Sequence, residues 1–488
     1  MGVALCLLFL LWFASGMVMM YCDYPSVSDA DRLSRAPILN PSKIRLSPQE
    51  AYARLQISSP PDTVRISTLD GRPVYRFGTG LDESVVYADD GQVQDEYPDD
   101  LTLRIAAAWT GQTPAPARVE QNTEEDQWTV SGEFAALRPM RKYTWPDGEE
   151  VYVSTVTGDV VQYSTRASRM GAYFGPIPHW LYFTPLRRHA STWAAIVIWA
   201  SGLGTVAALF GLVIGVSMYS PSKRFRRGGT PSSFPYAGSK RWHATLGLIF
   251  GILACSWTFS GMLSMDPFPK WQGEAEDSIG ARLSGALRGR SISLSDFDVK
   301  PPREALGGLR PTFPVKELEM TTFSGEPIYL AEAGPDETQI VPVRGAPTTE
   351  LDPSKIVDVI RNAAQPYQLA EVRLVTEYES YYVDRHHRRP LPVIFVQLNN
   401  EAQSAYYIDP KKGRIVQSYN SASRRNRWLY HGLHSIDLPW LYKHRPGWDI
   451  AVLTLLLGGL SLCVTSIILA AGVARKKLEP LAFWRSKH

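Results

Sequence analysis

Cysteine is scarce in this chain of 488 residues, and the polar parts of the sequence hold almost none of it. Three of the four cysteines, Cys6, Cys255 and Cys463, lie inside long apolar runs, and Cys22 lies at the edge of one. Disulfide-built domains and thiolate metal clusters both need several cysteines close together. The sequence therefore predicts neither feature in its polar segments.

Nucleotide and hydrolase motifs are also missing. We find no G-x-G-x-x-G that follows a strand and opens a helix, no P-loop, no H-E-x-x-H and no G-x-S-x-G. The formal net charge is only +3, and the basic residues group beside the apolar runs. A nucleic acid is therefore not an expected partner.

Four long apolar runs are present instead, and each approaches the roughly 20 residues that cross a bilayer core. Their positions are 2–21, 191–219, 244–265 and 449–473, with Asp449 the main charged exception. We therefore predict four membrane helices in contact with lipid. The first run also has small residues near its end, at Ala14-Ser15-Gly16, as a cleaved signal peptide would. No basic segment precedes it and it matches the third run, so a retained helix is the preferred interpretation.

The basic residues predict the orientation of these helices. Short loops rich in Lys and Arg stay in the cytoplasm, and two segments qualify. The loop carries Lys223, Arg224, Arg226, Arg227, Lys240 and Arg241, and the tail carries Arg475, Lys476, Lys477, Arg485 and Lys487. We expect a bacterial inner-membrane protein with both termini cytoplasmic. The expected order is helix 2–21, periplasmic domain 22–188, helix 189–219, cytoplasmic loop 220–243, helix 244–265, periplasmic domain 266–445, helix 446–474 and tail 475–488.

An internal repeat relates the two halves. Residues 12–17 read W-F-A-S-G-M and residues 257–262 read W-T-F-S-G-M. Internal repeats define architecture, so we predict a tandem duplication of helix, polar domain, helix. Small Ser and Gly residues let membrane helices approach closely. We therefore expect this motif to be the seam between the first and third helices of a pseudo-two-fold bundle.

Each polar segment has the pattern of an α+β domain. Ser47-Pro48-Gln49-Glu50 predicts a capped helix start, and strand-like alternation at 63–69 and 73–77 flanks an Asp70-Gly71 turn. The second half repeats this order. Its elements are a helix from Asp352-Pro353, strands at 371–378 and 391–398, and a hairpin over 405–416 with Gly413 in its turn.

This combination of a helix with hairpins, ending in V-S-T-V-T-G-D-V-V in one half and Y-x-D-x-x-x-G-x-I-V in the other, resembles the PepSY domain. The order of span, such a domain and span, twice over, is similar to the PepSY-associated transmembrane protein family along nearly the whole chain. That family includes bacterial inner-membrane siderophore-iron reductases. The resemblance implies a di-haem protein that carries electrons across the membrane.

Histidines gather at the predicted membrane edges. Six of the nine lie there: His179, His189, His243, His431, His434 and His444. We interpret His386, His387 and His488 as solvated surface. His189 and Trp193 match His444 and Trp448 as H-x-x-x-W steps, and His179 matches His431 if a three-residue gap is allowed. Interfacial anchoring is the alternative role for such residues.

Imidazole is a standard axial ligand of haem iron, and a four-helix bundle can hold a porphyrin. We therefore predict that the six edge histidines bind haem b, with two haems in total, one near His243 and one near the other five. Trp12 and Trp257 are candidates to lie between them. The repeat places the partner of His243 two residues before Met1, so we expect either that the chain starts upstream or that the inner haem has lost a ligand.

The main functional hypothesis is therefore a membrane haem protein that carries electrons outward to a periplasmic acceptor, a ferric siderophore, in iron uptake. This activity would make it a transmembrane ferric-siderophore reductase. Its electrons would come from a separate donor, either a quinol or a cytoplasmic flavoprotein. One alternative is a membrane-anchored PepSY module that binds and regulates periplasmic peptidases. Another is a non-catalytic subunit of an uptake complex.

Overall fold

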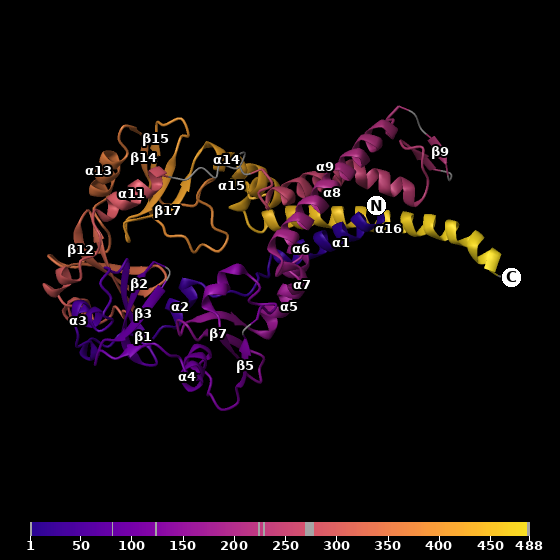
Figure 1. Ribbon diagram of the computed structural model, residues 1–488. Helices are drawn as coiled ribbons and strands as arrows, with labels where there is room; N and C mark the ends of the chain where they lie inside the picture. Colours follow the sequence, from indigo (N-terminus) through magenta and orange to yellow (C-terminus); the bar gives the residue numbers. More distant parts are fainter. Residues whose placement is uncertain are drawn as a thin grey trace.

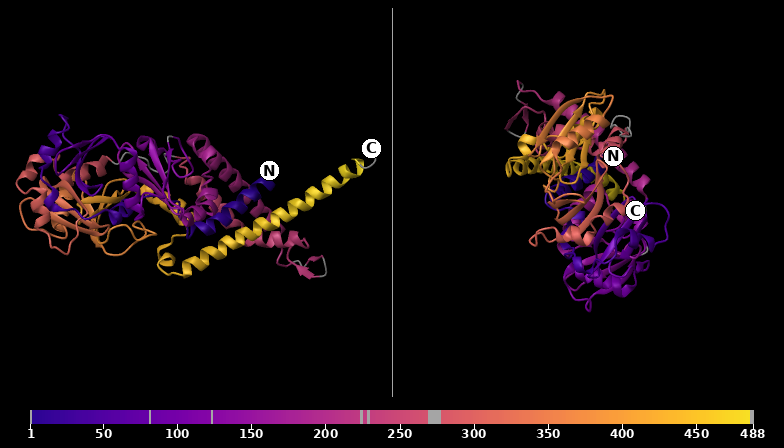
Figure 2. Two further views of the ribbon diagram at one scale, coloured as in Figure 1. Left: turned by 90° about the horizontal axis from the view of Figure 1, so that it is seen from below. Right: turned by 90° about the vertical axis from the view of Figure 1, so that its left-hand side faces the viewer.

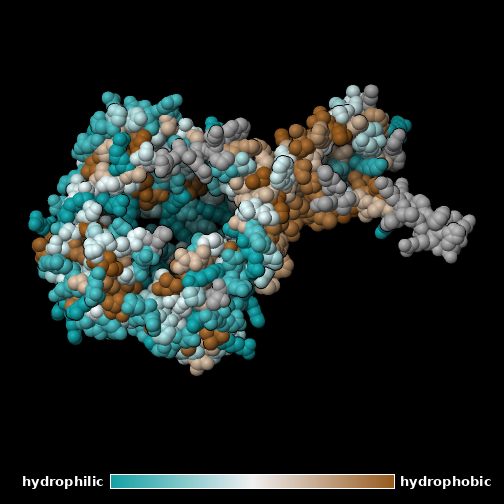
Figure 3. All heavy atoms as spheres, viewed as in Figure 1, coloured by the Kyte–Doolittle hydropathy of each residue, from teal (hydrophilic) through white to brown (hydrophobic). Residues whose placement is uncertain are grey.

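A bundle of helices projects from one side of a larger, β-rich polar part (Figure 1). The computed structural model describes residues 2–80, 82–122, 124–222, 225–227, 230–268 and 278–485. The left-hand view of Figure 2 shows the same division from below, and Figure 3 shows that the bundle surface is largely apolar whereas the rest is largely hydrophilic. The chain is thus a mixed α and β protein associated with a membrane through its helices.

Three helices are long and apolar enough to cross a membrane: α8 (Ala190–Met218), α9 (Ser239–Leu263) and α16 (Gly447–Arg485), the last through its first 29 residues. The first predicted span forms a shorter helix, α1 (Gly2–Met19). Along the bundle, α1 packs on α16, α16 on α9, and α9 on α8. We call the end of this bundle that faces the sheets its domain end.

Phenylalanine rings pack closely against glycines between the helices of the bundle. A Cβ atom added to Gly458 would lie 2.2 Å from Phe250, and one added to Gly459 would lie 2.4 Å from Phe13. These contacts join α16 to α9 and to α1. Direct contact between α1 and α9 instead runs through the rings of Phe13 and Trp257, whose centroids are 5.7 Å apart. The prediction that the Ser and Gly of the repeated motif form a seam between these two helices is wrong, because those residues face other side chains, described below.

A seven-stranded antiparallel sheet forms the centre of the polar part and takes strands from both halves of the chain. Its order is β13-β12-β11-β1-β2-β3-β4. The first half gives β1 (Thr63–Leu69), β2 (Arg72–Thr79), β3 (Asp82–Tyr87) and β4 (Val93–Gln94). The second gives β11 (Glu317–Phe323), β12 (Glu326–Gly334) and β13 (Glu337–Pro342).

The two halves of this sheet are built alike. Asp70-Gly71 connects β1 to β2, and Ser324-Gly325 connects β11 to β12, with all four residues at positive φ. Such two-residue turns match the twist of a hairpin. The halves join where β1 pairs antiparallel with β11, and the central register pair there is Arg65 with Glu319.

Each half adds a second unit of one helix and a four-stranded antiparallel meander. The first has α4 (Asp99–Thr110), β5 (Arg118–Asn122), β6 (Met140–Thr144), β7 (Glu150–Ser154) and β8 (Val160–Ser164). The second has α13 (Pro353–Ala363), β14 (Leu369–Val375), β15 (Val393–Leu398), β16 (Ala405–Asp409) and β17 (Arg414–Tyr419).

Several local predictions are confirmed. Ser47 caps α3 (Pro48–Ala53) with the expected capping box to Glu50, and Asp352 caps α13. Gly413 has a positive φ in the β16–β17 turn. The remaining helices are α2 (Asp29–Arg35), α5 (Arg166–Phe174), α6 (Pro176–Trp180), α7 (Thr184–Arg187), α11 (Ser278–Arg288), α12 (Pro302–Gly307), α14 (Ser421–Arg427) and α15 (Pro439–Tyr442). A short hairpin, β9 (Phe225–Arg227) and β10 (Thr230–Ser232), lies between α8 and α9.

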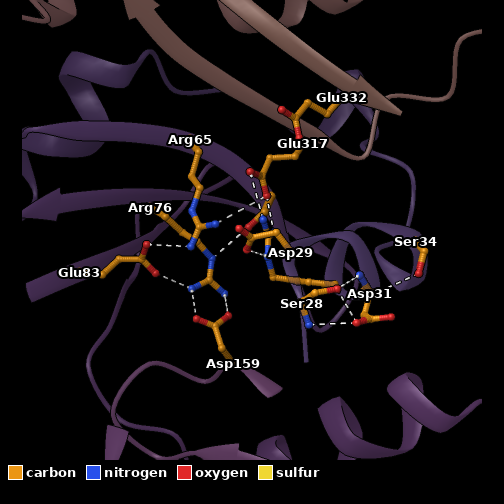
Figure 4. A network of polar contacts seen from close by, with 12 residues as sticks. Ser28, Asp29, Asp31, Ser34, Arg65, Arg76, Glu83, Asp159, Glu317 and Glu332 are labelled. Carbon is orange, nitrogen blue, oxygen red and sulfur yellow. Dashed lines mark hydrogen bonds and ion pairs between the residues drawn. The ribbon is translucent and has the colours of Figure 1, made fainter. Parts of the chain in front are cut away.

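A network of charged side chains fixes the first meander against the shared sheet (Figure 4). Arg76 of β2 is only 5% exposed and pairs with Glu83 at 2.7 Å and with Asp159 of the β7–β8 turn at 3.0 Å. Arg65 connects Glu83 with Glu317 of the second half. Because a buried charge is costly without partners, these pairs define how the units dock.

Candidate functional site

A cavity of about 530 Å³ lies at the domain end of the bundle. All four bundle helices line it, together with α6 and the segment around residues 430–435. Its walls are mainly aromatic and aliphatic, and they include the two tryptophans of the repeated motif, Trp12 and Trp257. Cofactor pockets commonly span about 300–1,000 Å³ with apolar walls and a few polar groups, so this cavity has the size and lining of a cofactor site.

Two histidines, one from each half of the chain, meet in this cavity. His179 lies on α6, and His434 follows a short π-helical turn (Trp428–Gly432). Their ring centroids are 6.0 Å apart and their ring planes meet at 66°. Both rings stay partly accessible because they line the cavity.

The repeated motif holds the His179 ring by its Nδ1 atom. This nitrogen lies 3.2 Å from the Trp12 carbonyl oxygen and 3.2 Å from the Ser15 hydroxyl. A carbonyl oxygen only accepts, so Nδ1 carries the proton. Ser15 donates its own proton to the Leu11 carbonyl at 2.6 Å and therefore accepts from the imidazole. The Nε2 lone pair is then available to a ligand.

The second copy of the motif holds His434 in the same way. The His434 Nδ1 atom lies 3.1 Å from the Ser260 hydroxyl, and the His434 imidazole also forms a hydrogen bond with the backbone of Trp257. Histidines that bind metals commonly donate their other ring N–H to a backbone carbonyl, which fixes tautomer and orientation. The hydrogen bonds of His179 to Trp12 and of His434 to Trp257 are interactions of this kind.

The glycine of each motif makes room for its histidine. A Cβ atom added to Gly16 would lie 3.4 Å from Cε1 of His179, and one added to Gly261 would lie 3.4 Å from Cε1 of His434. A Cβ atom there would already be in van der Waals contact with the ring, so a side chain larger than that of alanine would press on the imidazole. The motif W-x-x-S-G is therefore a socket for an imidazole, in which the carbonyl, the hydroxyl and the missing side chain each act on the ring.

A tryptophan in the helix that follows each polar segment makes a further contact with the segment that carries the cavity histidine. Trp193 of α8 donates its indole N–H to the carbonyl of Trp180 at 2.8 Å, and Trp448 of α16 donates to the carbonyl of Ile436 at 3.0 Å. Each acceptor lies one or two residues after a cavity histidine. Each histidine segment is thus fixed between the helix before its polar domain and the helix after it.

The backbone is constrained at matching places. Leu181 and Ile436 each follow a cavity histidine by two residues, and both have positive φ, at 53° and 50°. Residues other than glycine in this region cost about 1–3 kcal/mol and cluster at functional sites. The strain occurs in both halves at the same distance from the histidine, which marks these turns as part of the site.

Both cavity histidines are neutral at physiological pH. Burial lowers the pKa of His179 to about 3, and the neighbouring His434 lowers it further in the same direction. Burial likewise lowers the pKa of His434 to about 4. Only neutral imidazole offers a lone pair to a metal, so these groups are ready to act as ligands.

The other predicted site histidines lie elsewhere. His189 and His444 are exposed at the starts of α8 and α16 and do not line the cavity. His431 is exposed, with its ring 4.5 Å from that of Tyr430, a residue of the cavity wall. His243 lies on α9 near its start, and its Nδ1 atom is 3.0 Å from the Thr465 hydroxyl of α16.

Two details of the predicted pairing are corrected by these contacts. The structural counterpart of His179 is His434 and not His431, because His179 and His434 are the histidines that contact the two copies of the W-x-x-S-G motif. In each H-x-x-x-W step the tryptophan donates a hydrogen bond to the segment that carries the cavity histidine, whereas the histidine of the step is on the surface. His386 is 41% exposed and pairs with Asp23 at 3.4 Å, and His387 is exposed. His488, Lys223 and Arg224 lie outside the described residues.

Among the described residues, His179 and His434 are the pair of imidazoles that could hold a cofactor at the domain end. Among the residues that the structure describes, no three His, Cys, Asp or Glu side chains gather as a metal site. The prediction of a second haem near His243 stays untested, and His243 has no second histidine beside it in the described chain.

Comparison with protein-family models finds no match, and comparison with curated proteins finds no relative.

Proposed function

We propose that this chain is a membrane haem protein in which His179 and His434 bind one haem b at the domain end of the bundle, and that it carries electrons outward to a periplasmic acceptor, a ferric siderophore. The observation that carries the proposal is the matched pair of imidazoles. Two imidazoles that bind one metal ion from opposite sides have their nitrogens about 4 Å apart, because each metal–nitrogen bond is about 2 Å. Adding the ring radii gives roughly the observed 6.0 Å between centroids.

The chain's own residues would bind and orient this group. Nε2 of each histidine would hold the haem iron, while the backbones of Trp12 and Trp257 would keep each ring in the required tautomer. Aromatic and aliphatic side chains of the cavity would exclude water from the bound group. Bound haem would supply a one-electron iron couple whose potential depends on those ligands and on burial.

The orientation extends the coarser finding of three membrane-length helices. We propose α1 as a fourth span, because its 18 residues rise about 27 Å, close to the ~30 Å hydrocarbon core. The basic segment between α8 and α9 would then be cytoplasmic, as would both termini. The cavity would lie near the periplasmic face of the bacterial inner membrane.

The acceptor would meet the protein on its polar side. Figure 3 shows a hydrophilic hollow between the two lobes of the polar part, next to the base of the bundle. We propose that the helix-and-meander units around α4 and α13 belong to two PepSY-like domains. A polar hollow suits a hydrophilic iron chelate, and reduction of Fe(III) to Fe(II) weakens its bonds to hard oxygen ligands.

The test is a reduced-minus-oxidised spectrum of the purified full chain, expressed with haem supplied. We expect a bis-histidine haem b spectrum with one haem per chain. His179→Ala and His434→Ala should each abolish it, whereas His189→Ala should not. A protein without a Soret band would contradict the proposal. If changes on the meander surfaces abolished function while both cavity variants kept it, the peptidase-regulating module would be the better interpretation.

A further inference from the structure

Arg385 is the one charged side chain among the described residues that line the cavity. It belongs to the loop between β14 and β15, so it comes from the second polar unit and not from the bundle. One of its N–H groups donates to the carbonyl of Met19 at 3.1 Å. Met19 is the last residue of α1, where helix carbonyls lack partners within the helix. Arg385 therefore stands at the mouth of the cavity with a defined anchor.

The loop that presents Arg385 is ordered by its own contacts. The Asp384 carboxylate accepts the backbone N–H groups of His386, Arg388 and Arg389 at 2.5–2.9 Å. The Tyr378 hydroxyl donates to the Arg389 carbonyl at 2.8 Å. A side chain on such a loop needs little further ordering to bind a ligand.

Two carboxylates close to Arg385 or to the cavity lining already have partners. Asp449 pairs with Arg445 at 3.2 Å and accepts the Tyr21 hydroxyl, and Asp23 pairs with His386. Within the part of the chain that the structure describes, Arg385 makes no ion pair. Its guanidinium has five N–H donors in a planar fork, which suits a carboxylate.

We propose that Arg385 binds a carboxylate of the cavity's occupant, so that the site selects a planar apolar molecule with an acidic edge and holds that edge toward the polar domains. The inference rests on the proposed function, in which the carboxylate is a haem propionate. It assigns the orientation of the cofactor, with the acidic edge at the mouth and the apolar edge toward Phe9 and Phe13 of α1, which also line the cavity.

The experiment compares two probes on the full-length protein in detergent: haem b and haem whose propionates are esterified. Binding is followed by the Soret band and by quenching of tryptophan fluorescence, since tryptophans line the cavity. Arg385→Gln should weaken haem binding about 10- to 100-fold, as loss of a charged hydrogen bond does, and leave ester binding unchanged. Arg388→Gln, in the same loop but outside the cavity lining, is the matched control and should change neither.

The outcomes separate the two proposals. If wild type binds haem and Arg385→Gln binds it equally well, the carboxylate contact is overturned while the haem site stands. If wild type binds the ester as tightly as haem, the contact is likewise overturned. If wild type binds neither probe, the proposed function itself fails and the inference falls with it.

Discussion

His179 and His434 belong to different halves of the chain, yet their imidazole rings lie 6.0 Å apart in one cavity. Each ring is held by the same group of atoms, a tryptophan carbonyl and a serine hydroxyl from the preceding helix. The pseudo-two-fold relation of the halves therefore produces a site with two equivalent donors. The following predictions test the parts of that site separately.

Removing a cavity imidazole should remove the cofactor, whereas removing an edge imidazole should not. We expect His434→Ala to lose the haem spectrum, because one axial ligand disappears and its socket is empty. His444→Ala is the matched control, since His444 is exposed on the same half of the chain. Absorbance per chain after purification measures the effect. Equal haem loss in the two variants would show that both act through folding and not through ligation.

A larger side chain in place of the motif glycine should displace the histidine ring while the imidazole itself stays unchanged. Gly261→Val adds atoms beside a Cβ position that is already 3.4 Å from His434, so the imidazole must move and haem content should fall at least tenfold. Gly211→Val on α8 is the control, because no atom lies within 4 Å of its added Cβ. Circular dichroism should be unchanged in both. Retained haem in Gly261→Val would contradict the socket.

Removing the serine hydroxyl should have a milder effect. Ser260→Ala leaves the Trp257 carbonyl as the acceptor for His434 and deletes the second acceptor. Changes to such supporting contacts typically cost about 10- to 100-fold in affinity. Haem titration of the apoprotein measures this loss. An affinity equal to that of wild type would show that the carbonyl alone orients the ring.

The tryptophan that follows each histidine segment should stabilise its turn. Trp448→Phe keeps the ring but loses the indole N–H that reaches the Ile436 carbonyl, which is worth about 1 kcal/mol. We expect weaker haem binding by roughly fivefold, because the turn holds His434. Trp199→Phe is the control, since Trp199 is 71% exposed on the bundle surface. The two variants would have to differ in haem affinity for this role to stand.

The ion pairs that dock the first meander should make stability depend on pH. Burial acts to raise the pKa of Glu83, but Arg76 and Arg65 outweigh it, so the pKa lies below its usual value. A carboxyl with a lowered folded-state pKa stabilises the protein above its unfolded-state pKa, about 4.3, and that contribution is lost as the pH falls through the folded-state pKa.

Glu83→Gln should therefore lower the melting temperature at pH 7, and the difference from wild type should shrink as the pH falls below the unfolded-state pKa of about 4.3 and through the lower folded-state pKa. Thermal unfolding followed by circular dichroism at several pH values measures it. Glu96→Gln, at an exposed position close in sequence, should match wild type throughout. A difference for Glu83→Gln that stayed constant with pH would rule out an electrostatic origin.

Local structure was accessible from the sequence because short-range chemistry determines it. Ser47, the Asp70-Gly71 turn and Asp352 each specify a cap or a turn within a few residues. The pairing of β1 with β11 was not accessible, since it depends on how the two halves meet in space. The polar segments were read as separate domains, and strand patterns alone do not show that they share a sheet.

The cavity was only partly accessible from the sequence. The repeated W-x-x-S-G motif and the edge histidines were both visible, but their contact was not, because the histidines come long after each motif in the chain. Sequence spacing favoured His431 as the partner of His179, whereas the turn at Ile436 brings His434 to the socket. A better signal was the tryptophan of each H-x-x-x-W step. It contacts the backbone of the segment that carries the cavity histidine, which precedes the step in the chain.

The antiparallel join between β1 and β11 has a consequence for the origin of the two halves. The matching turns make Arg65 the counterpart of Glu319, and these residues are also register partners, so the pseudo-two-fold axis passes between them. In a symmetric dimer of one ancestral half, this position would face its own copy, and a charged residue there would meet the same charge. In this chain Arg65 and Glu319 carry opposite charges at these equivalent positions, which a dimer of two identical halves could not do.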